Sequence, residues 1–265
     1  MITELAESLA MALDPLTFAR ATGIEPDLWQ RQVLISDARR LLILAGRQVG
    51  KSTVTGLLAL RSALYEPGSL VLIFAPALRQ SSEFFLKIRQ AHAKIAYPPC
   101  GLERETATEL VFSHGSRIVC NPGTEKSTRG FSSVSTLIID EASRIDPALF
   151  PSVAPMVTLD GRIVLLTTPF GARGTFHELW SDGDAEWQRL KVRAADVPRR
   201  WPAEELVRQR AALGDWWYSQ EFDVSFVESS DQVFSYELIQ SCVSPLVQPL
   251  FAAGGESEDP WVRST

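Results

Sequence analysis

Residues 41–55 read LLILAGRQVGKSTVT, and this stretch decides the fold of the chain. Its first five residues are an uninterrupted apolar run, which predicts a buried strand over residues 41–45. A glycine-containing turn follows, and apolar residues then recur at helical spacing from residue 54 to residue 64. The stretch therefore predicts a strand, a loop and a helix in direct succession.

The loop after this strand matches the phosphate-binding pattern G-x-x-x-x-G-K-[ST], with Ala45 in place of the first glycine. Backbone N–H groups of such a loop and the helix N-terminus beneath it attract the phosphates of a nucleotide. Gly50 would leave room for them, Lys51 would neutralise their charge, and Ser52 would offer its hydroxyl to Mg²⁺, with Thr53 as a weaker alternative. The candidate nucleotide-binding residues of the loop are Gly46, Arg47, Gln48, Val49, Gly50, Lys51, Ser52 and Thr53. A chance Gly-Lys-Ser turn is disfavoured by the strand-to-helix context.

An acidic pair, Asp140 and Glu141, ends a second apolar run, for which we predict a strand over residues 136–139. Successive side chains of a strand point to opposite faces, so the two carboxylates can take different tasks where the strand ends. Asp140 would hold Mg²⁺ through water, and Glu141 would orient and activate the attacking water. The alternative for the pair alone is an acidic cap of the following helix.

Further apolar runs predict strands over residues 70–75 and 162–167, and residues 79–96 repeat apolar positions at helical spacing. Residues 109–112 and 117–120 predict a β-hairpin around His114-Gly115. Strands that alternate with helices indicate a mostly parallel sheet covered on both faces, the doubly wound α/β class. A ligand then binds at the carboxyl ends of the strands.

Two further groups of residues are expected near the phosphates. Thr167, Thr168 and Pro169 follow a predicted strand, so they would lie at the same sheet edge as Glu141 and sense the γ-phosphate. The alternative is an ordinary strand-to-turn exit. Arg47 offers a rigid multi-donor guanidinium that would reach the γ-phosphate or pair with a carboxylate, and the alternative is a solvated loop side chain.

Trp29 and Gln30 precede the first strand of the core and are candidates for reading adenine. The amide of Gln30 matches the donor and acceptor edge of that base, and Trp29 would pack nearby. The alternative is that Trp29 is a core residue.

Composition limits the classes of protein that fit. The chain has 265 residues, 45% of them hydrophobic and 22% charged, which is typical of a globular protein large enough for a sizeable core. The formal net charge of −6 argues against a protein that coats nucleic acid through a general basic field, so any contact with DNA must be local. We expect no secretion and no membrane span, because the amino terminus lacks a basic region and no window approaches eighteen apolar residues.

We expect four segments along the chain. Residues 1–35 are expected to form an N-terminal helical lid with the candidate adenine motif, and residues 36–198 the phosphate-loop core. Residues 199–250 predict a small C-terminal helical part, and the polar residues 251–265 predict a disordered tail.

Taken together, residues 27–234 resemble the ATPase domain of phage terminase large subunits, with a more distant likeness to superfamily 2 helicases. Trp29-Gln30 resembles the adenine motif of that family, the arginine-bearing loop its Walker A, residues 138–142 its Walker B, and residues 167–169 its coupling motif. Thr128-Arg129-Gly130-Phe131 looks like its Arg-Gly segment, which makes Arg129 a candidate arginine finger acting on a neighbouring subunit. The alternative for Arg129 is a structural turn residue.

The resemblance implies a P-loop NTPase of the ASCE type that hydrolyses ATP with Mg²⁺ and moves double-stranded viral DNA into a procapsid. It implies as partners a portal protein, a terminase small subunit and further copies in a homo-oligomeric ring, although the isolated chain is expected to be a monomer. The implied location is the host cytoplasm, with transient docking on the procapsid. Lys87, Arg89 and Lys94 are candidates for the DNA-facing surface, although solvated helix faces look the same.

Family members ordinarily continue into a nuclease domain, for which the sequence up to Thr265 leaves no room, so we expect ATPase without endonuclease activity. Two alternatives stay open. One is a fragment of a superfamily 2 helicase-like translocase. The other is a nucleotide-binding assembly module that does not hydrolyse ATP.

Overall fold

The computed structural model describes residues 2–122 and 130–227, which fall within one compact unit, Met1–Val227. The segments expected at 1–35 and 36–198 are therefore parts of one unit. Arg129, the expected tail at 251–265 and residues 228–250 of the part expected at 199–250 lie outside the described residues.

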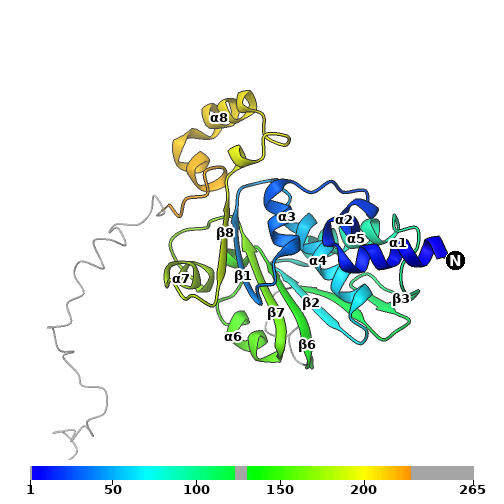
Figure 1. The fold of residues 1–265 in the computed structure, drawn as a ribbon. Helices are drawn as coiled ribbons and strands as arrows, with labels where there is room; N and C mark the ends of the chain where they lie inside the picture. Colours follow the sequence, from blue (N-terminus) through cyan, green and yellow to red (C-terminus); the bar gives the residue numbers. More distant parts are fainter. Residues whose placement is uncertain (1, 123–129, 228–265) are drawn as a thin grey trace, which may run out of the picture. The chain divides into compact units, whose positions relative to one another are not determined.

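A mixed eight-stranded sheet forms the centre of the described part, in the order β3-β4-β5-β2-β6-β7-β1-β8 (Figure 1). The six strands from β5 to β8 in this order run parallel, and β3 and β4 are antiparallel additions at one edge. The strands are β1 Arg40–Ala45, β2 Leu70–Ala75, β3 Leu102–Glu105, β4 Glu109–Phe112, β5 Arg117–Pro122, β6 Val134–Asp140, β7 Val157–Thr167 and β8 Gln188–Val192. The predicted mostly parallel sheet and the predicted hairpin, which is β4 and β5, are confirmed.

Helices cover both faces of this sheet. They are α1 Ile2–Leu13, α2 Pro15–Ala21, α3 Leu28–Ile35, α4 Lys51–Tyr65, α5 Leu78–His92, α6 Leu149–Val153, α7 Thr175–Ser181 and α8 Ala203–Glu221, with short 3₁₀ turns η2 Ala142–Arg144, η3 Ala154–Met156 and η4 Ala194–Asp196. Leu41 and Ile43 of β1 pack into the core beneath α3, α4 and α5, whereas Leu42 and Leu44 pack with α6 and α7. Successive side chains of β1 thus pack into two cores on opposite faces of the sheet, which explains why residues 41–45 are all apolar.

The strand order brings three loops to one edge. β7 lies between β1 and β6, and the parallel registers pair Leu44 with Thr167 and Asp140 with Leu166. The carboxyl ends of β1, β7 and β6 therefore lie next to one another. One strand between the phosphate-loop strand and the acidic strand is the arrangement expected for the ASCE type.

The N-terminal helices do not form the expected lid. Asp14 caps α2 by accepting hydrogen bonds from the backbone N–H groups of Leu16 and Thr17. Phe18 of α2 is fully buried and meets the ring of Tyr65, at the end of α4, edge to face. Neither α1 nor α2 contributes a residue to the cavity at the phosphate loop. These helices cover the far end of α4, which corrects the lid interpretation.

The last helix among the described residues is kinked. α8 runs from Ala203 to Glu221, and the backbone of Gly214 inside it is not helical (φ 77°, ψ 164°). A positive φ costs glycine little, so the chain changes direction there and continues as a helix. Among the described residues, no helix is both long and apolar enough to span a bilayer.

Candidate active site

The phosphate loop joins β1 to α4, and its conformation requires a glycine at position 50. Gly50 has a left-handed backbone (φ 98°, ψ 27°), and a Cβ atom there would lie 2.6 Å from Nε2 of Gln30. A side chain at this position would therefore meet both backbone strain and a steric clash. The requirement for glycine derived from the sequence has a geometric basis.

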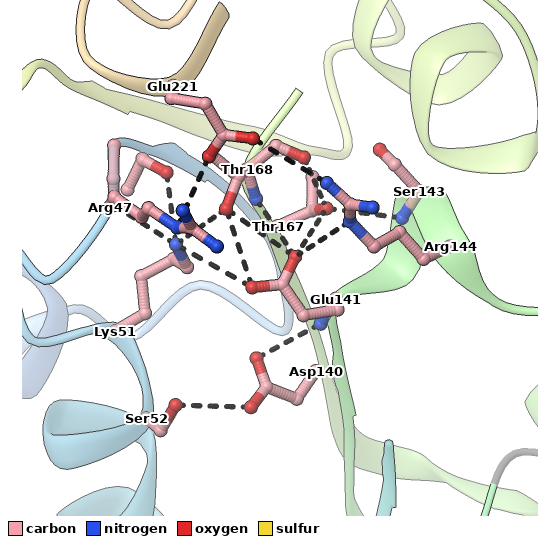
Figure 2. A network of polar contacts seen from close by, with 12 residues as sticks. Arg47, Lys51, Ser52, Asp140, Glu141, Ser143, Arg144, Thr167, Thr168 and Glu221 are labelled. Carbon is pink, nitrogen blue, oxygen red and sulfur yellow. Dashed lines mark hydrogen bonds and ion pairs between the residues drawn. The ribbon is translucent and has the colours of Figure 1, made fainter. Parts of the chain in front are cut away.

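Lys51 begins α4 and points back across the loop. Its side chain is 8% exposed, and Nζ donates to the carbonyl oxygens of Ala45 at 3.1 Å and Gly46 at 3.0 Å and to Oγ1 of Thr168 at 3.0 Å. Nζ also lies 3.9 Å from Oε1 of Glu141 (Figure 2). Lys51 of the phosphate loop and Glu141 of the acidic pair therefore meet at one place.

Ser52 and Asp140 form a second contact between the phosphate loop and the acidic pair. Oγ of Ser52 donates to Oδ2 of Asp140 at 3.1 Å, and Oδ1 of Asp140 accepts the backbone N–H of Glu141 at 3.0 Å. Burial, and then the neighbouring charge of Glu141, raise the pKa of Asp140 to about 6. The described residues contain no cluster of three or more His, Cys, Asp or Glu side chains suited to a metal. A hydroxyl beside a carboxylate nevertheless fits Mg²⁺, which prefers oxygen ligands, keeps several waters and takes the rest from a nucleotide.

Glu141 occupies a strained position directly after β6. Its backbone is left-handed (φ 49°, ψ 47°), which is uncommon for a residue other than glycine. The carboxylate accepts from the backbone N–H of Thr168 at 3.3 Å and from Oγ1 of Thr168 at 3.4 Å. Such strain is typical of functional sites, and here it turns the carboxylate toward the phosphate loop.

Thr167 and Thr168 lie at the same edge as Glu141, as predicted. Thr167 is fully buried, and its Oγ1 donates to the carbonyl oxygen of Thr168 at 2.7 Å and accepts from the backbone N–H of Ser143 at 3.2 Å. Thr168 contacts both Lys51 and Glu141, so it bridges the cation and the carboxylate. The sensing role of this segment, Pro169 included, stays a prediction.

Arg47 pairs with a carboxylate, which was one of the expected outcomes. Its Nε lies 3.6 Å from Oε2 of Glu221, and its backbone N–H donates to the carbonyl oxygen of Glu221 at 2.9 Å. Its own carbonyl oxygen accepts from Nε1 of Trp201 at 2.9 Å. The side chain remains 67% exposed, so it is free to turn toward a ligand.

The sequence reasoning missed three charged residues that line the site, Glu221, Arg144 and Arg200. Glu221 is buried at the end of α8, and Arg144 of η2 lies between Glu221 and Glu141 (Figure 2). No local motif marks either residue, because the sheet and α8 bring them together from distant parts of the chain. The only signal in the sequence is the position of Arg144 three residues after Glu141.

Gln30 braces the phosphate loop from below. It is 1% exposed, its Oε1 accepts the backbone N–H of Asp27 at 2.9 Å, and its Nε2 donates to the carbonyl oxygen of Gly50 at 3.1 Å. Trp29 is buried in the core, in agreement with its alternative interpretation. The adenine role of Gln30 stays a prediction, and bracing the loop is its role in this structure.

A cavity of about 530 Å³ opens beside these groups. Its lining is strongly polar: Arg47, Gln48, Gly50, Lys51, Ser52, Thr53, Gln80, Lys87, Glu141, Arg144, Thr168, Arg200 and Glu221. Lys87 lines this cavity and Arg89 pairs with Glu105, and the DNA-facing role considered above for both stays a prediction. Five cations face two carboxylates in this lining, which suits an anionic ligand such as a triphosphate.

The sequence matches a known protein family and curated relatives. Residues 42–241 match the family described as "Terminase large subunit, T4likevirus-type, N-terminal". The terminase large subunit of Thermus virus P23-45 is 25% identical over 256 residues, covering 82% of this chain and 52% of that protein. The chain thus spans about half the length of this relative.

Solved structures show the same fold. The large terminase ATPase domain of Thermus phage P74-26 superposes with a TM-score of 0.68 at 22% identity, covering 79% of this chain and 97% of that domain. The large terminase of a thermophilic bacteriophage, solved in complex with ADP, gives a TM-score of 0.64 at 11% identity, with 76% of this chain and 54% of that protein covered. At these identities the likeness concerns the fold.

Proposed function

This chain belongs to the T4-type terminase large-subunit family, whose N-terminal part it matches, and from that premise we propose that it binds and hydrolyses ATP with Mg²⁺. One observation carries the proposal. Lys51 of the phosphate loop and Glu141 of the acidic strand meet across one cavity, with Nζ and Oε1 3.9 Å apart. A cation for the phosphates and a base for water thus lie within reach of a single bound triphosphate.

Lys51 and Arg47 would act on the phosphates. Lys51 is already desolvated and fixed by three hydrogen bonds, so it needs little reorganisation to stabilise charge that develops on the β- and γ-phosphates. Arg47 is exposed and would turn from Glu221 toward the γ-phosphate. Together they would supply most of the positive charge that phosphoryl transfer requires from the protein.

Glu141 would orient the attacking water and accept its proton. Its carboxylate is held by Thr168, whose hydroxyl also contacts Lys51, so the base and the phosphate-binding cation share one anchor. Mg²⁺, when bound by Ser52 and through water by Asp140, would supply further positive charge beside the phosphates. The chemistry of these two oxygen ligands fits that ion.

We place this activity in a DNA-packaging motor. Membership of the family supports double-stranded DNA as the substrate that is moved. We propose a portal protein, a terminase small subunit and further copies in a homo-oligomeric ring as partners, and the host cytoplasm, with docking on the procapsid, as the location. The segment from Thr167 to Pro169 would relay hydrolysis, because Thr168 touches both catalytic side chains. The arginine finger proposed at Arg129 lies outside the described residues.

The test compares two variants of the full chain. Glu141→Gln keeps the size of the base but removes its charge, so steady-state ATPase should fall by roughly 100-fold or more while calorimetric binding of Mg·ATPγS persists. Lys51→Ala should abolish both binding and turnover. Arg208→Ala provides a control, since Arg208 is 74% exposed on α8 and pairs with Glu205.

Three outcomes are informative. Unchanged turnover in Glu141→Gln would refute the assignment of the base. Nucleotide binding without turnover in the wild-type chain, with DNA present, would favour the non-hydrolysing assembly module. DNA-stimulated turnover that falls steeply with added salt would support the motor.

A further inference from the structure

Arg144 is the residue of the cavity whose surroundings call for a function beyond those assigned above. Its guanidinium lies 4.0 Å (Nε) from Oε2 of Glu141 and 3.7 Å (Nη2) from Oε1 of Glu221 (Figure 2). The same group stacks over the ring of Phe170, with Cζ 4.1 Å from the ring centroid. Arg144 thus contacts the catalytic carboxylate, the end of α8 and the residue after Pro169 at once.

The position of Arg144 is fixed by its backbone. Its N–H donates to the carbonyl oxygen of Glu141 at 2.8 Å, in the 3₁₀ turn that follows the left-handed residue. The aromatic platform of Phe170 holds the guanidinium plane from the other side. The side chain can therefore exchange between two carboxylates without leaving its place.

Glu221 is shared by two guanidinium groups. Oε1 faces Arg144 at 3.7 Å and Oε2 faces Arg47 at 3.6 Å, while its backbone carbonyl is bound to the phosphate loop through the N–H of Arg47. Its side chain is 9% exposed, so it depends on these two cations for compensation of its charge. If Arg47 turns away, Arg144 is left as the compensating partner.

We propose that Arg144 is a positioning residue that releases Glu141 for catalysis when a triphosphate binds. The inference rests on the proposed function. Without nucleotide, Lys51 and Arg144 both hold the carboxylate of Glu141, and Arg47 and Arg144 both hold that of Glu221.

The charge of an arriving triphosphate changes these pairings. The phosphates draw the exposed Arg47 toward themselves and share the charge of Lys51, so Glu221 loses one of its two cations. Arg144 then pairs more strongly with Glu221, and Glu141 keeps its hydrogen bonds to Thr168 while its pairing with Lys51 and Arg144 weakens. The carboxylate of Glu141 becomes free to bind the attacking water. The ion pair between Arg144 and Glu221, at the end of α8, is stronger when nucleotide is bound.

Steady-state ATPase of the full chain tests this role. Arg144→Ala should lower kcat by roughly 10- to 100-fold, because Glu221 is then left with Arg47 alone and holds it away from the γ-phosphate, while KM for Mg·ATP changes less than about threefold. Arg144→Lys should restore part of kcat, because an ammonium keeps the charge but lacks the planar fork and the stacking on Phe170. Calorimetric binding of Mg·ATPγS should stay near the wild-type value in Arg144→Ala, which separates positioning from loss of the folded site.

A double-mutant cycle with Glu221→Gln tests the exchange itself. If Arg144 acts through Glu221, the loss of kcat in the double variant should be smaller than the product of the two single losses. Arg208→Ala, on the same helix as Glu221, should behave as wild type.

The outcomes separate this inference from the proposed function. Suppose that the wild type hydrolyses ATP. The positioning role is then refuted, and the ATPase assignment stands, if Arg144→Ala keeps the wild-type kcat or loses Mg·ATPγS binding. It is also refuted if the loss of kcat in the double variant with Glu221→Gln equals the product of the two single losses. If the wild type neither binds nor hydrolyses ATP, the proposed function fails, and this inference fails with it.

Discussion

Replacing Asp140 by asparagine should stabilise the nucleotide-free protein while weakening its use of Mg²⁺. Burial raises the pKa of Asp140 from the usual 3.8 to about 6, which means that the ionised form is disfavoured in the folded state. That rise corresponds to about 3 kcal/mol, on the scale of 1.36 kcal/mol for each unit of pKa. Asparagine carries no charge, and it can still accept the N–H of Glu141 and hydrogen-bond with Ser52.

The effect should depend on pH in a defined direction. Because the folded pKa is raised, the contribution of Asp140 to stability is fully present below pH 3.8 and is lost as the pH rises through about 6. Asp140→Asn should therefore exceed wild type by up to about 3 kcal/mol at pH 8, and the difference should shrink toward pH 4. For a unit of this size, about 3 kcal/mol corresponds to a rise in Tm of about 6 to 12 °C.

Urea unfolding in EDTA at pH 4, 5, 6 and 8 measures this difference, because other groups titrate alike in both proteins. Asp14→Asn serves as a control in which the stability difference from wild type should have the opposite sign, since a hydrogen bond from the Thr17 hydroxyl lowers the pKa of Asp14. A stability difference that is the same at pH 4 and pH 8, or an Asp140→Asn variant less stable than wild type at pH 8, would refute the burial argument. Mg²⁺-dependent binding of ATPγS should be weaker in Asp140→Asn throughout.

Three further perturbations test other parts of the structure. Gly50→Ala should lower the free energy of unfolding by about 1 to 3 kcal/mol and abolish nucleotide binding, measured by urea unfolding and calorimetry, because the new Cβ would lie 2.6 Å from Nε2 of Gln30. Trp201→Phe removes the donor to the carbonyl oxygen of Arg47, so it should lower the free energy of unfolding by about 1 kcal/mol and raise KM for ATP. An unchanged KM would show that this hydrogen bond does not set the conformation of the phosphate loop. Phe18→Ala should destabilise the chain by about 3 to 5 kcal/mol without changing KM for ATP, and a changed KM would contradict the placement of α2 away from the cavity.

The centre of the fold could be predicted from the sequence because its strands are buried on both faces. β1 and β2 are almost entirely apolar, and their predicted bounds differ from the observed ones by at most one residue. β3 and β8 were missed because edge strands need no apolar run: residues 102–105 read LERE and residues 188–192 read QRLKV. Such segments become strands because a neighbouring strand offers hydrogen-bonding groups, and no local pattern records that neighbour.

The residues of the site also fall into those that the sequence could predict and those that it could not. Lys51, Ser52, Asp140 and Glu141 could be found because each stands at the end of a strand or the start of a helix, where the topology fixes its place. Glu221 could not, since a carboxylate on α8 resembles any solvated helix residue until the fold buries it. The lid interpretation failed for a related reason: amphipathic spacing shows that α1 and α2 pack against something, but it does not say which end of α4 they cover.

The position of β1 in the sheet also bears on the synthesis of the chain. Its hydrogen-bonded neighbours are β7 and β8, which begin at Val157 and Gln188, so no earlier segment can pair with it. During translation the phosphate loop therefore leaves the ribosome long before its strand can be anchored, and the closing of this long-range contact is a slow, late event. A nascent chain that stops short of β7 cannot assemble the pocket. We therefore expect the phosphate loop to reach its final conformation only after β7 has been synthesised.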